Sequence, residues 1–379
     1  MSQGPALYIH VPFCVRKCYY CDFASQPYTS PMAEGYVSAL EQEAEHYLTS
    51  WPQGQEVPSV YIGGGTPTVL TPQELERVLQ VAAAFPRVAG AEWTVEANPG
   101  TLTKTKLALL KAAGVNRLSL GVQSFDDDLL VFLGRIHTAS EAKTAWDQAR
   151  RAGFDNLSLD LMYAIPGQSL KLWRQTLQEA LALAPEHIST YSLMIEEGTE
   201  FARRALEPCP EELDLAQYRE AQTRLEQAGL SQYEISNFAR PGYACQHNLV
   251  YWHNEPYLGL GPAATSYLAG ERRTNIRDTI SYVDSLGQGC LPIAERELAT
   301  PELAQAETVI LALRLREGLS RPRFARQFGR DVYAVFPQAI DRLMALGLVT
   351  MDEFSLSLTA KGLLLANQVA LEFLPNNFS

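Results

Sequence analysis

Strand-like and helix-like segments alternate along the first half of the chain, and this alternation constrains the fold more than any other feature. Six short apolar runs are predicted to be strands: 7–13, 59–65, 93–99, 117–123, 157–165 and 188–195. Amphipathic segments lie between them, for example 71–85, 103–114 and 170–185. Strict alternation of this kind favours a parallel sheet with right-handed crossovers. We therefore predict an α/β fold: a partial, parallel TIM-type barrel of about six units.

The alternation of strands and helices ends after about residue 200, and two different patterns follow. Residues 212–230 are predicted to be helical and 232–239 to form a strand, and a Tyr-, Gly- and Pro-rich stretch follows at 241–268. From about residue 300, helical segments and a hairpin pattern over 349–359 predict a small winged-helix-like module. We divide the chain into a barrel (1–200), an α+β extension (201–295) and a C-terminal winged-helix-like domain (296–379).

The charge balance argues against nucleic acid as the main partner. The chain has 31 Lys and Arg against 43 Asp and Glu, a net charge of −12, whereas phosphate contacts need a basic face. Residues 300–379 carry eight residues of each sign, so the last module is expected to pack or dock and not to bind DNA. The sequence shows neither a signal peptide nor an apolar run of the ~20 residues that a membrane span needs. We expect a cytoplasmic protein.

Three of the six cysteines, Cys14, Cys18 and Cys21, crowd into one loop after the first predicted strand. In a reducing compartment such clusters suggest metal or redox chemistry. Structural zinc normally takes four ligands, and a second pair of neighbouring cysteines is missing from the sequence. A dithiol pair would leave Cys14 unused. A [4Fe–4S] cluster normally takes four thiolates, so three would leave one iron open to bind a substrate directly.

Polar and glycine residues follow the other strands at the same predicted edge. The second strand ends in GGGTPT (63–68), where glycines allow a ligand to approach the backbone closely. Glu96, Gln123 and Asp160 lie at or near the ends of the next three strands, and Arg135 lies in a following loop. A lone polar residue near a strand end is usually just solvated. Together they suit a zwitterionic ligand that carries a ribose.

The spacing C-x₃-C-x₂-C resembles the signature loop of the radical S-adenosylmethionine (SAM) superfamily, and Tyr20 stands where that loop has an aromatic residue. The motifs YIHVPFC, GGGTPT, VEANP, LGVQSF and DLMYAIPGQ narrow the resemblance to the group around oxygen-independent coproporphyrinogen III dehydrogenase. Within that group the chain looks most like the HemW-type haem chaperones. The resemblance covers essentially the whole chain and implies a barrel of the radical SAM type.

The resemblance also implies roles for single residues. Cys14, Cys18 and Cys21 would hold a [4Fe–4S] cluster. The SAM site would be formed by Tyr8, Tyr20, Gly64, Gly65, Thr66, Glu96, Gln123, Arg135 and Asp160. Two departures from the dehydrogenase stand out: Phe23 replaces a fourth cysteine, and only seven residues precede Tyr8. Both argue against porphyrinogen decarboxylation and leave the SAM site intact.

The stretch HNLVYW (247–252) matches the HNxxYW motif of HemW. Haem iron accepts an imidazole, and aromatic neighbours suit the macrocycle. His247 is thus the predicted haem ligand, with Tyr251 and Trp252 beside it and Cys245 as a competing thiolate. The alternative is a buried, hydrogen-bonded histidine with an aromatic pair that belongs to the core. His253 is expected to face solvent, and Cys209 and Cys290 to be ordinary thiols.

Two functions follow from the resemblance. The first is a haem chaperone on a radical SAM scaffold, which binds haem as cargo and passes it to respiratory haem proteins. A homodimer and peripheral contact with membrane-bound clients stay open. The alternative is the dehydrogenase itself, which converts propionates of coproporphyrinogen III to vinyl groups. A radical SAM protein that modifies nucleic acid fits the fold but not the charge.

Overall fold

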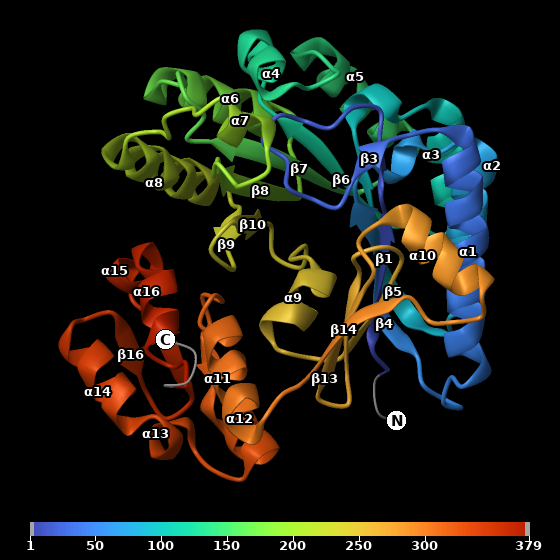
Figure 1. Ribbon diagram of the computed structural model, residues 1–379. Coiled ribbons are helices and arrows are strands. Elements are labelled where there is room, and N and C mark those ends of the chain that lie inside the picture. The colour runs from blue at the N-terminus through green and yellow to red at the C-terminus, as the bar shows by residue number, and fades with distance from the viewer. Residues whose placement is uncertain (1–3, 376–379) are drawn as a thin grey trace.

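The computed structural model describes residues 4–375, and its main feature is one twelve-stranded sheet that forms a partial barrel (Figure 1). Six parallel strands stand next to one another in chain order: β1 (Ala6–Val11), β4 (Val57–Gly64), β5 (Arg87–Ala97), β6 (Arg117–Gln123), β7 (Asn156–Tyr163) and β8 (His187–Ser192). These are the six predicted strands, with ends shifted by a few residues. The predicted α/β partial barrel is confirmed.

Helices connect these strands and cover the outside of the sheet, as Figure 1 shows. They are α1 (Ser30–Thr49), α2 (Pro72–Ala84), α3 (Lys104–Ala113), α4 (Asp127–Leu133), α5 (Ala139–Arg151) and α6 (Leu170–Ala182), and α7 (Glu200–Arg203) and α8 (Glu211–Gln227) follow β8. Local signals fix several helix ends. Thr71 and Glu74 form a capping box at the start of α2, and Gly114 ends α3 in the left-handed conformation, with φ 96°.

Strands of the segment 201–295 extend the same sheet on both edges. On one edge β11 (Tyr257–Leu260) lies parallel to β1, followed by the antiparallel strands β12 (Thr265–Leu268), β13 (Glu271–Asn275) and β14 (Ile293–Leu298), with α10 (Thr279–Gly287) between the last two. On the other edge β10 (Asn237–Ala239) and β9 (Ser231–Gln232) follow β8. The α+β segment is therefore continuous with the barrel sheet.

One strand prediction is wrong. Residues 232–239 do not form a single strand, because the chain turns between β9 and β10. The buried carboxylate of Glu234 accepts a hydrogen bond from the Ser236 amide at 3.1 Å, which stabilises the turn. A pattern of alternating residues does not reveal such a local bond.

The C-terminal residues form a module with its own core. It contains α11 (Pro301–Ala312), α12 (Arg321–Phe328), α13 (Val332–Val335), α14 (Pro337–Ala345), α15 (Ala360–Leu364), α16 (Ala366–Leu371) and a sheet of β15 (Leu319–Ser320), β17 (Ser355–Leu358) and β16 (Val349–Met351). Its core packs Val309, Phe324, Ile340 and Phe373, apart from the core of the barrel. The predicted hairpin is present as β16 and β17.

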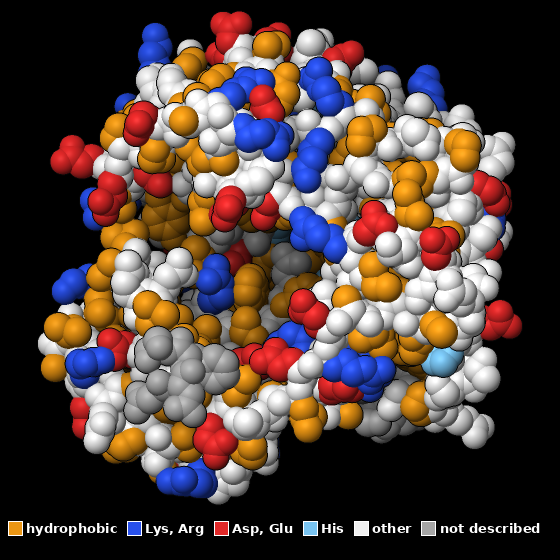
Figure 2. Space-filling model, in the orientation of Figure 1, with side chains coloured by type: hydrophobic (Ala, Val, Ile, Leu, Met, Phe, Trp, Pro, Cys, Tyr) orange, Lys and Arg blue, Asp and Glu red, His pale blue; other side chains and the backbone are white. Residues whose placement is uncertain are grey.

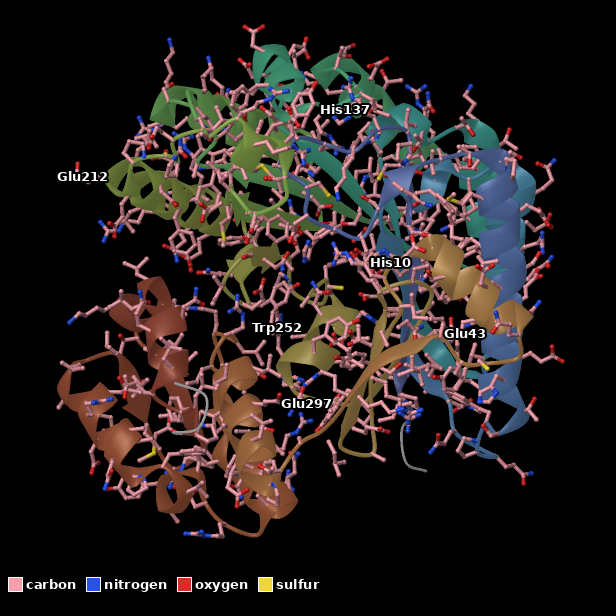
Figure 3. All side chains as sticks on the ribbon, viewed as in Figure 1. His10, Glu43, His137, Glu212, Trp252 and Glu297 are labelled. Carbon is pink, nitrogen blue, oxygen red and sulfur yellow. The ribbon has the colours of Figure 1, made fainter. Side chains whose placement is uncertain are left out.

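The helix α9 (Gln246–Trp252) lies between the barrel and this module (Figure 1). Trp252, labelled in Figure 3, meets the guanidinium of Arg314 at 4.9 Å from its ring centre, so the contact between the two parts includes a cation–π pair. No helix within residues 4–375 combines the length and the apolar character that crossing a bilayer requires.

Candidate functional site

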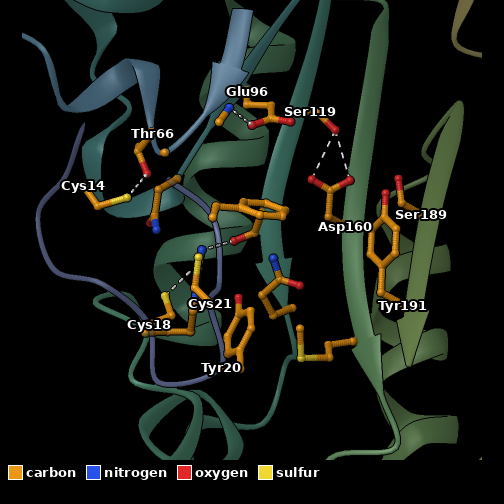
Figure 4. A pocket seen from close by; sticks show the side chains of 18 of the residues that line it. Cys14, Cys18, Tyr20, Cys21, Thr66, Glu96, Ser119, Asp160, Ser189 and Tyr191 are labelled. Atoms are coloured by element: carbon orange, nitrogen blue, oxygen red, sulfur yellow. Dashed lines mark hydrogen bonds between the residues drawn. The ribbon is translucent and has the colours of Figure 1, made fainter. Parts of the chain in front are cut away.

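A cavity of about 370 Å³ opens at the carboxyl ends of the parallel strands. Its wall contains the three predicted cluster cysteines on one side and side chains of β5 to β8 on the other, as Figure 4 shows. Parallel barrels place ligands at this end, because the loops that follow the strands converge there. Of the predicted site residues, this wall brings together Cys14, Cys18, Tyr20, Cys21, Gly64, Gly65, Thr66, Glu96, Gln123, Arg135 and Asp160.

The cysteine loop follows β2 (Phe13–Cys14), which pairs with β3 (Gln26–Pro27). The Cys14 thiol lies 3.6 Å from the Thr66 hydroxyl, and the Cys18 thiol accepts a hydrogen bond from Arg135 at 3.4 Å. All three thiols are partly exposed to the cavity. Burial raises the pKa of Cys14 and of Cys21, so a cation or metal is needed to keep them as thiolates.

The GGGTPT turn packs against the segment that precedes Cys14 and forms backbone hydrogen bonds with it. The Gly65 amide donates to the carbonyl of Val11 at 2.8 Å, and the Thr66 amide to that of Phe13 at 2.7 Å. A Cβ atom at Gly65 would lie only 2.6 Å from the Phe13 oxygen, so glycine is required for this close approach. The turn thereby fixes the start of the cysteine loop.

Two carboxylates point into the cavity, that of Glu96 from β5 and that of Asp160 from β7. Glu96 accepts hydrogen bonds from the Tyr61 hydroxyl at 2.6 Å and the Gly64 amide at 3.1 Å, and burial raises its pKa to about 7. Asp160 accepts from the Ser119 hydroxyl at 3.0 Å (Figure 4), and burial raises its pKa as well. Such acceptors suit the hydroxyl and ammonium groups of a ligand.

Gln123 has a strained backbone, with φ 70°, and it lies at an irregularity of the β6–β7 pairing. A left-handed conformation is uncommon for this residue type and is often found at functional sites. Its side-chain oxygen is buried without a partner in the described chain, and so is Nε of Arg135. Buried polar atoms usually have partners. Both residues therefore fit a polar ligand that would complete their hydrogen bonds.

Tyr8 is displaced from the other predicted SAM residues. It lies in β1, its hydroxyl is 2.9 Å from Nδ1 of His10, and it lines a smaller neighbouring cavity. That cavity of about 300 Å³ shares Gly64 and Glu96 with the main one. Tyr8 therefore lies behind the glycine turn, close to the predicted ligand but not on its wall.

The sequence and the fold of this chain are similar to those of known proteins. Residues 8–180 match the model of the radical SAM superfamily, and residues 299–365 match the HemN C-terminal domain. The haem chaperone HemW of Bacillus subtilis (strain 168) is 39% identical over 373 residues, which are 97% of this chain and 98% of that protein. The chain belongs to the HemW family. HemW of Escherichia coli (strain K12) is 36% identical, with 97% and 98% covered.

The HemW fold is also similar to a solved structure. That structure, coproporphyrinogen III oxidase (HemN) from Escherichia coli, described as a radical SAM enzyme, has a TM-score of 0.86 and 26% identity, and the match covers 98% of this chain and 90% of that one. Membership of the radical SAM superfamily implies a [4Fe–4S] cluster and SAM binding.

The donor set of this HemW chain fits such a cluster. Within residues 4–375, no three Cys, His, Asp or Glu side chains converge on one point as they would around a single metal ion. A cube with three cysteine ligands binds them at three different corners, so its thiols need to surround a cavity without meeting at a point. Cys14, Cys18 and Cys21 do this. When bound, such a cluster would supply electron-transfer chemistry at this site.

The HNLVYW motif of this HemW chain lies at the opposite end of the barrel, where α9 closes the floor. His247 is 1% exposed; its Nδ1 lies 3.0 Å from the Ser59 hydroxyl and its Nε2 2.9 Å from that of Tyr251. The His247 amide and the Cys245 thiol both donate to Glu92, at 3.2 and 3.3 Å.

In this structure both ring nitrogens of His247 and the thiol of Cys245 thus make hydrogen bonds within the chain. The motif has the features of the alternative interpretation, a buried histidine beside aromatic residues, and the role of His247 as haem ligand stays a prediction. Of its residues, Asn248 reaches the wall of the main cavity. His253 is partly exposed and lies 3.1 Å from Glu317.

Burial makes His247 sensitive to acid. Burial, with Arg117 nearby, lowers its pKa from the ordinary 6.5 to about 3. The unfolded chain therefore takes up the proton first, so the stabilising contribution of neutral His247 is complete above pH 6.5 and is lost as the pH falls toward 3. We expect His247→Gln to reduce the slope of unfolding free energy against pH by about 1.4 kcal/mol per pH unit between about pH 6 and pH 4.

Urea unfolding at several pH values measures this slope, and His46→Gln, at an exposed position of α1, is the control. Equal slopes in the His247 variant and the wild type would show that His247 is already protonated or exposed in the folded protein.

Several residues of the cavity wall were missed in the sequence analysis. They include Tyr61, Ser119, Ser189 and Tyr191, and Figure 4 shows the last three beside or opposite Asp160. A signal was present, because inward positions of a strand alternate: Ser119 stands two residues before Gly121, and Ser189 two before Tyr191. Small polar side chains at such positions leave room for a ligand.

Proposed function

We propose that this HemW protein binds haem as cargo and delivers it to haem proteins, on a scaffold that holds a [4Fe–4S] cluster and SAM. The observation that carries the proposal is the similarity, over 97% of the chain, to two proteins named haem chaperone HemW. The cavity supports it, because three thiols and a set of unpartnered polar groups face one space. Respiratory haem proteins are the proposed acceptors, the cytoplasm is the proposed location, and a homodimer is the form to test by light scattering.

The residues of the site divide into two proposed roles. Cys14, Cys18 and Cys21 hold the cluster. Glu96, Gln123, Arg135 and Asp160 bind SAM with the GGGTPT turn, where the backbone of Gly64, Gly65 and Thr66 meets its methionine end. Tyr20, on the cavity wall, packs beside the cluster.

Two measurements test the chaperone function. The protein is reconstituted anaerobically with iron and sulfide, titrated with haemin and followed by absorption. The haem-loaded protein is then mixed with a haem-depleted haem protein, and recovery of the acceptor's spectrum is measured. Saturable binding of haem followed by transfer supports the proposal. Absence of specific binding would falsify it.

The second function with specific support is porphyrinogen oxidation, because the match to the HemN structure extends over 98% of this chain. Incubation with coproporphyrinogen III, SAM and a reductant tests it directly. Formation of vinyl products and 5′-deoxyadenosine would favour the enzyme. Haem transfer without such products would favour the chaperone.

The proposed SAM site leads to a separate prediction. We expect Glu96→Gln to weaken SAM binding by at least about tenfold, because charged hydrogen bonds contribute about 1.5–3 kcal/mol. Equilibrium dialysis of the reconstituted protein with labelled SAM measures the change. Glu212→Gln, at an exposed site of α8 (Figure 3), is the matched control. Unchanged affinity in the Glu96 variant would remove this residue from the site.

A further inference from the structure

We propose that haem docks across the mouth of the cysteine cavity, on an apolar rim formed by Val15, Phe23, Tyr191 and Met194, and not at His247. The inference rests on the proposed chaperone function, since it concerns where the cargo binds. It places a flat, apolar, dianionic macrocycle against one side of the cysteine loop and the segment that follows β8.

The rim residues are apolar and exposed, yet they all contact one cavity. Phe23 is 59% exposed and Met194 64%, and Val15 and Tyr191 are 51% and 42% exposed. Single exposed apolar side chains are normal on a protein surface. Four exposed apolar side chains that line one cavity are a better indication of a binding site than scattered single ones. Two come from the cysteine loop, and two come from the end of β8 and the loop after it.

The size and the polar lining of the cavity favour a position of the macrocycle outside it, over the mouth. The inner wall is polar and carries Glu96, Gln123 and Asp160, which suit SAM. A volume of about 370 Å³ is at the lower end of the range for a single small ligand, about 300–1,000 Å³. A porphyrin that shares this cavity with SAM and a cluster must lie over the mouth.

Two cations, Lys17 and Arg277, bond to the backbone of the cysteine loop beside Phe23, and the carboxylates Asp22 and Glu196 also line the cavity. The Lys17 ammonium donates to the Phe23 carbonyl at 2.9 Å, and the Arg277 guanidinium donates to the Asp22 carbonyl at 2.7 Å. In residues 4–375 neither cation has a carboxylate within 4.0 Å. Both cations can therefore donate charge-assisted hydrogen bonds to a haem propionate.

Figure 2 shows the surface hollowed between the barrel and the C-terminal module, with hydrophobic side chains along the hollow and both acidic and basic side chains around it.

Met194 offers the iron a ligand. Methionine thioethers and histidine imidazoles are common axial ligands of haem, and both ring nitrogens of His247 are engaged at the barrel floor. Met194 lies on the loop between β8 and α7, and its unbranched side chain adjusts easily to a bound surface.

The first test uses anaerobically reconstituted protein titrated with haemin. Phe23→Ser removes apolar contact area and should weaken haem binding about tenfold. Met194→Leu keeps the apolar contact but removes the sulfur, so the ferric spectrum should lose the weak red absorption typical of a thioether ligand. Met344→Leu, at an exposed methionine of the C-terminal module, is the control and should leave both unchanged.

The second test concerns the propionates. The double variant Lys17→Gln and Arg277→Gln should bind haemin about tenfold more weakly at low salt, and the difference should shrink at high salt. Haemin dimethyl ester lacks the carboxylates, so its affinity should be the same for the double variant and the wild type. Iron and sulfide content is measured for each variant, because Lys17 and Arg277 both bond to the cysteine loop.

The outcomes distinguish failure of the proposed chaperone function from failure of the proposed haem site at the rim. If wild-type protein does not bind haemin, the chaperone function itself fails. If it binds haemin and every rim variant binds with unchanged affinity and spectrum, the function stands and the rim site is overturned. Haem binding that is lost in folded His247→Gln but kept in the rim variants would place the cargo at the barrel floor and also overturn the rim site.

Discussion

Cys14→Ser, Cys18→Ser and Cys21→Ser are each expected to abolish the [4Fe–4S] cluster. A serine hydroxyl is a poor ligand for these irons, and three thiolates are already one fewer than such a cube normally has. Each variant should therefore lose the broad visible absorption of the cluster and nearly all bound iron and sulfide after anaerobic reconstitution. SAM binding should fall with them if the open iron belongs to the proposed SAM site.

The chain provides its own controls for this experiment. Cys209→Ser and Cys290→Ser change cysteines that lie outside the cavity wall, so both variants should reconstitute as well as the wild type. A Cys14, Cys18 or Cys21 variant that retained full iron and sulfide would show that the ligand set is different.

Gly65→Ala is expected to have the second large effect on stability and on the cluster, although the substitution changes no cluster ligand. Its Cβ would lie 2.6 Å from the carbonyl oxygen of Phe13 and 2.8 Å from that of Val11. Backbone atoms cannot rotate away as a side chain can, so the turn and the start of the cysteine loop must separate. Overpacking of this kind costs about 1–3 kcal/mol, and the shift would move Cys14, which follows Phe13 directly.

We therefore expect a lower free energy of unfolding in urea and also poor cluster reconstitution in the Gly65 variant. Gly287→Ala is the matched control, because its added Cβ has no neighbour within 4 Å. Gly287 ends α10, so alanine there should be neutral or stabilise by up to about 1 kcal/mol. Normal cluster content in Gly65→Ala would mean that the loop tolerates the displacement.

The sequence predicts the barrel well because its six strands are local patterns. Each apolar run and each amphipathic segment carries its own period, and parallel connection then brings Glu96, Gln123 and Asp160 to one edge. The cysteine spacing identifies the loop without knowledge of the fold. These parts of the site follow from short-range information.

The remaining features depend on contacts between distant residues. The pairing of β1 with β11 joins residues 6–9 to 257–260, and nothing in either segment specifies the other. His247 lies in a motif expected to face a ligand, and its Nδ1 lies 3.0 Å from the hydroxyl of Ser59, a residue 188 positions earlier. The left-handed Gln123 depends on an irregular β6–β7 register. Periodicity within one segment cannot reveal these partners.

Side-chain hydrogen bonds at the floor of the barrel, where α9 packs, determine which parts of the molecule can unfold locally. α9 bonds to Ser59 of β4 and Glu92 of β5, while His187 of β8 lies 2.8 Å from the Ser158 hydroxyl of β7. Amide hydrogens of these strands near the floor should exchange with deuterium only when the whole barrel unfolds. The cysteine loop and the residues after β8 have few such bonds, so their amides should exchange through small local openings. The barrel end that carries the cysteine loop can therefore open locally while its base stays closed.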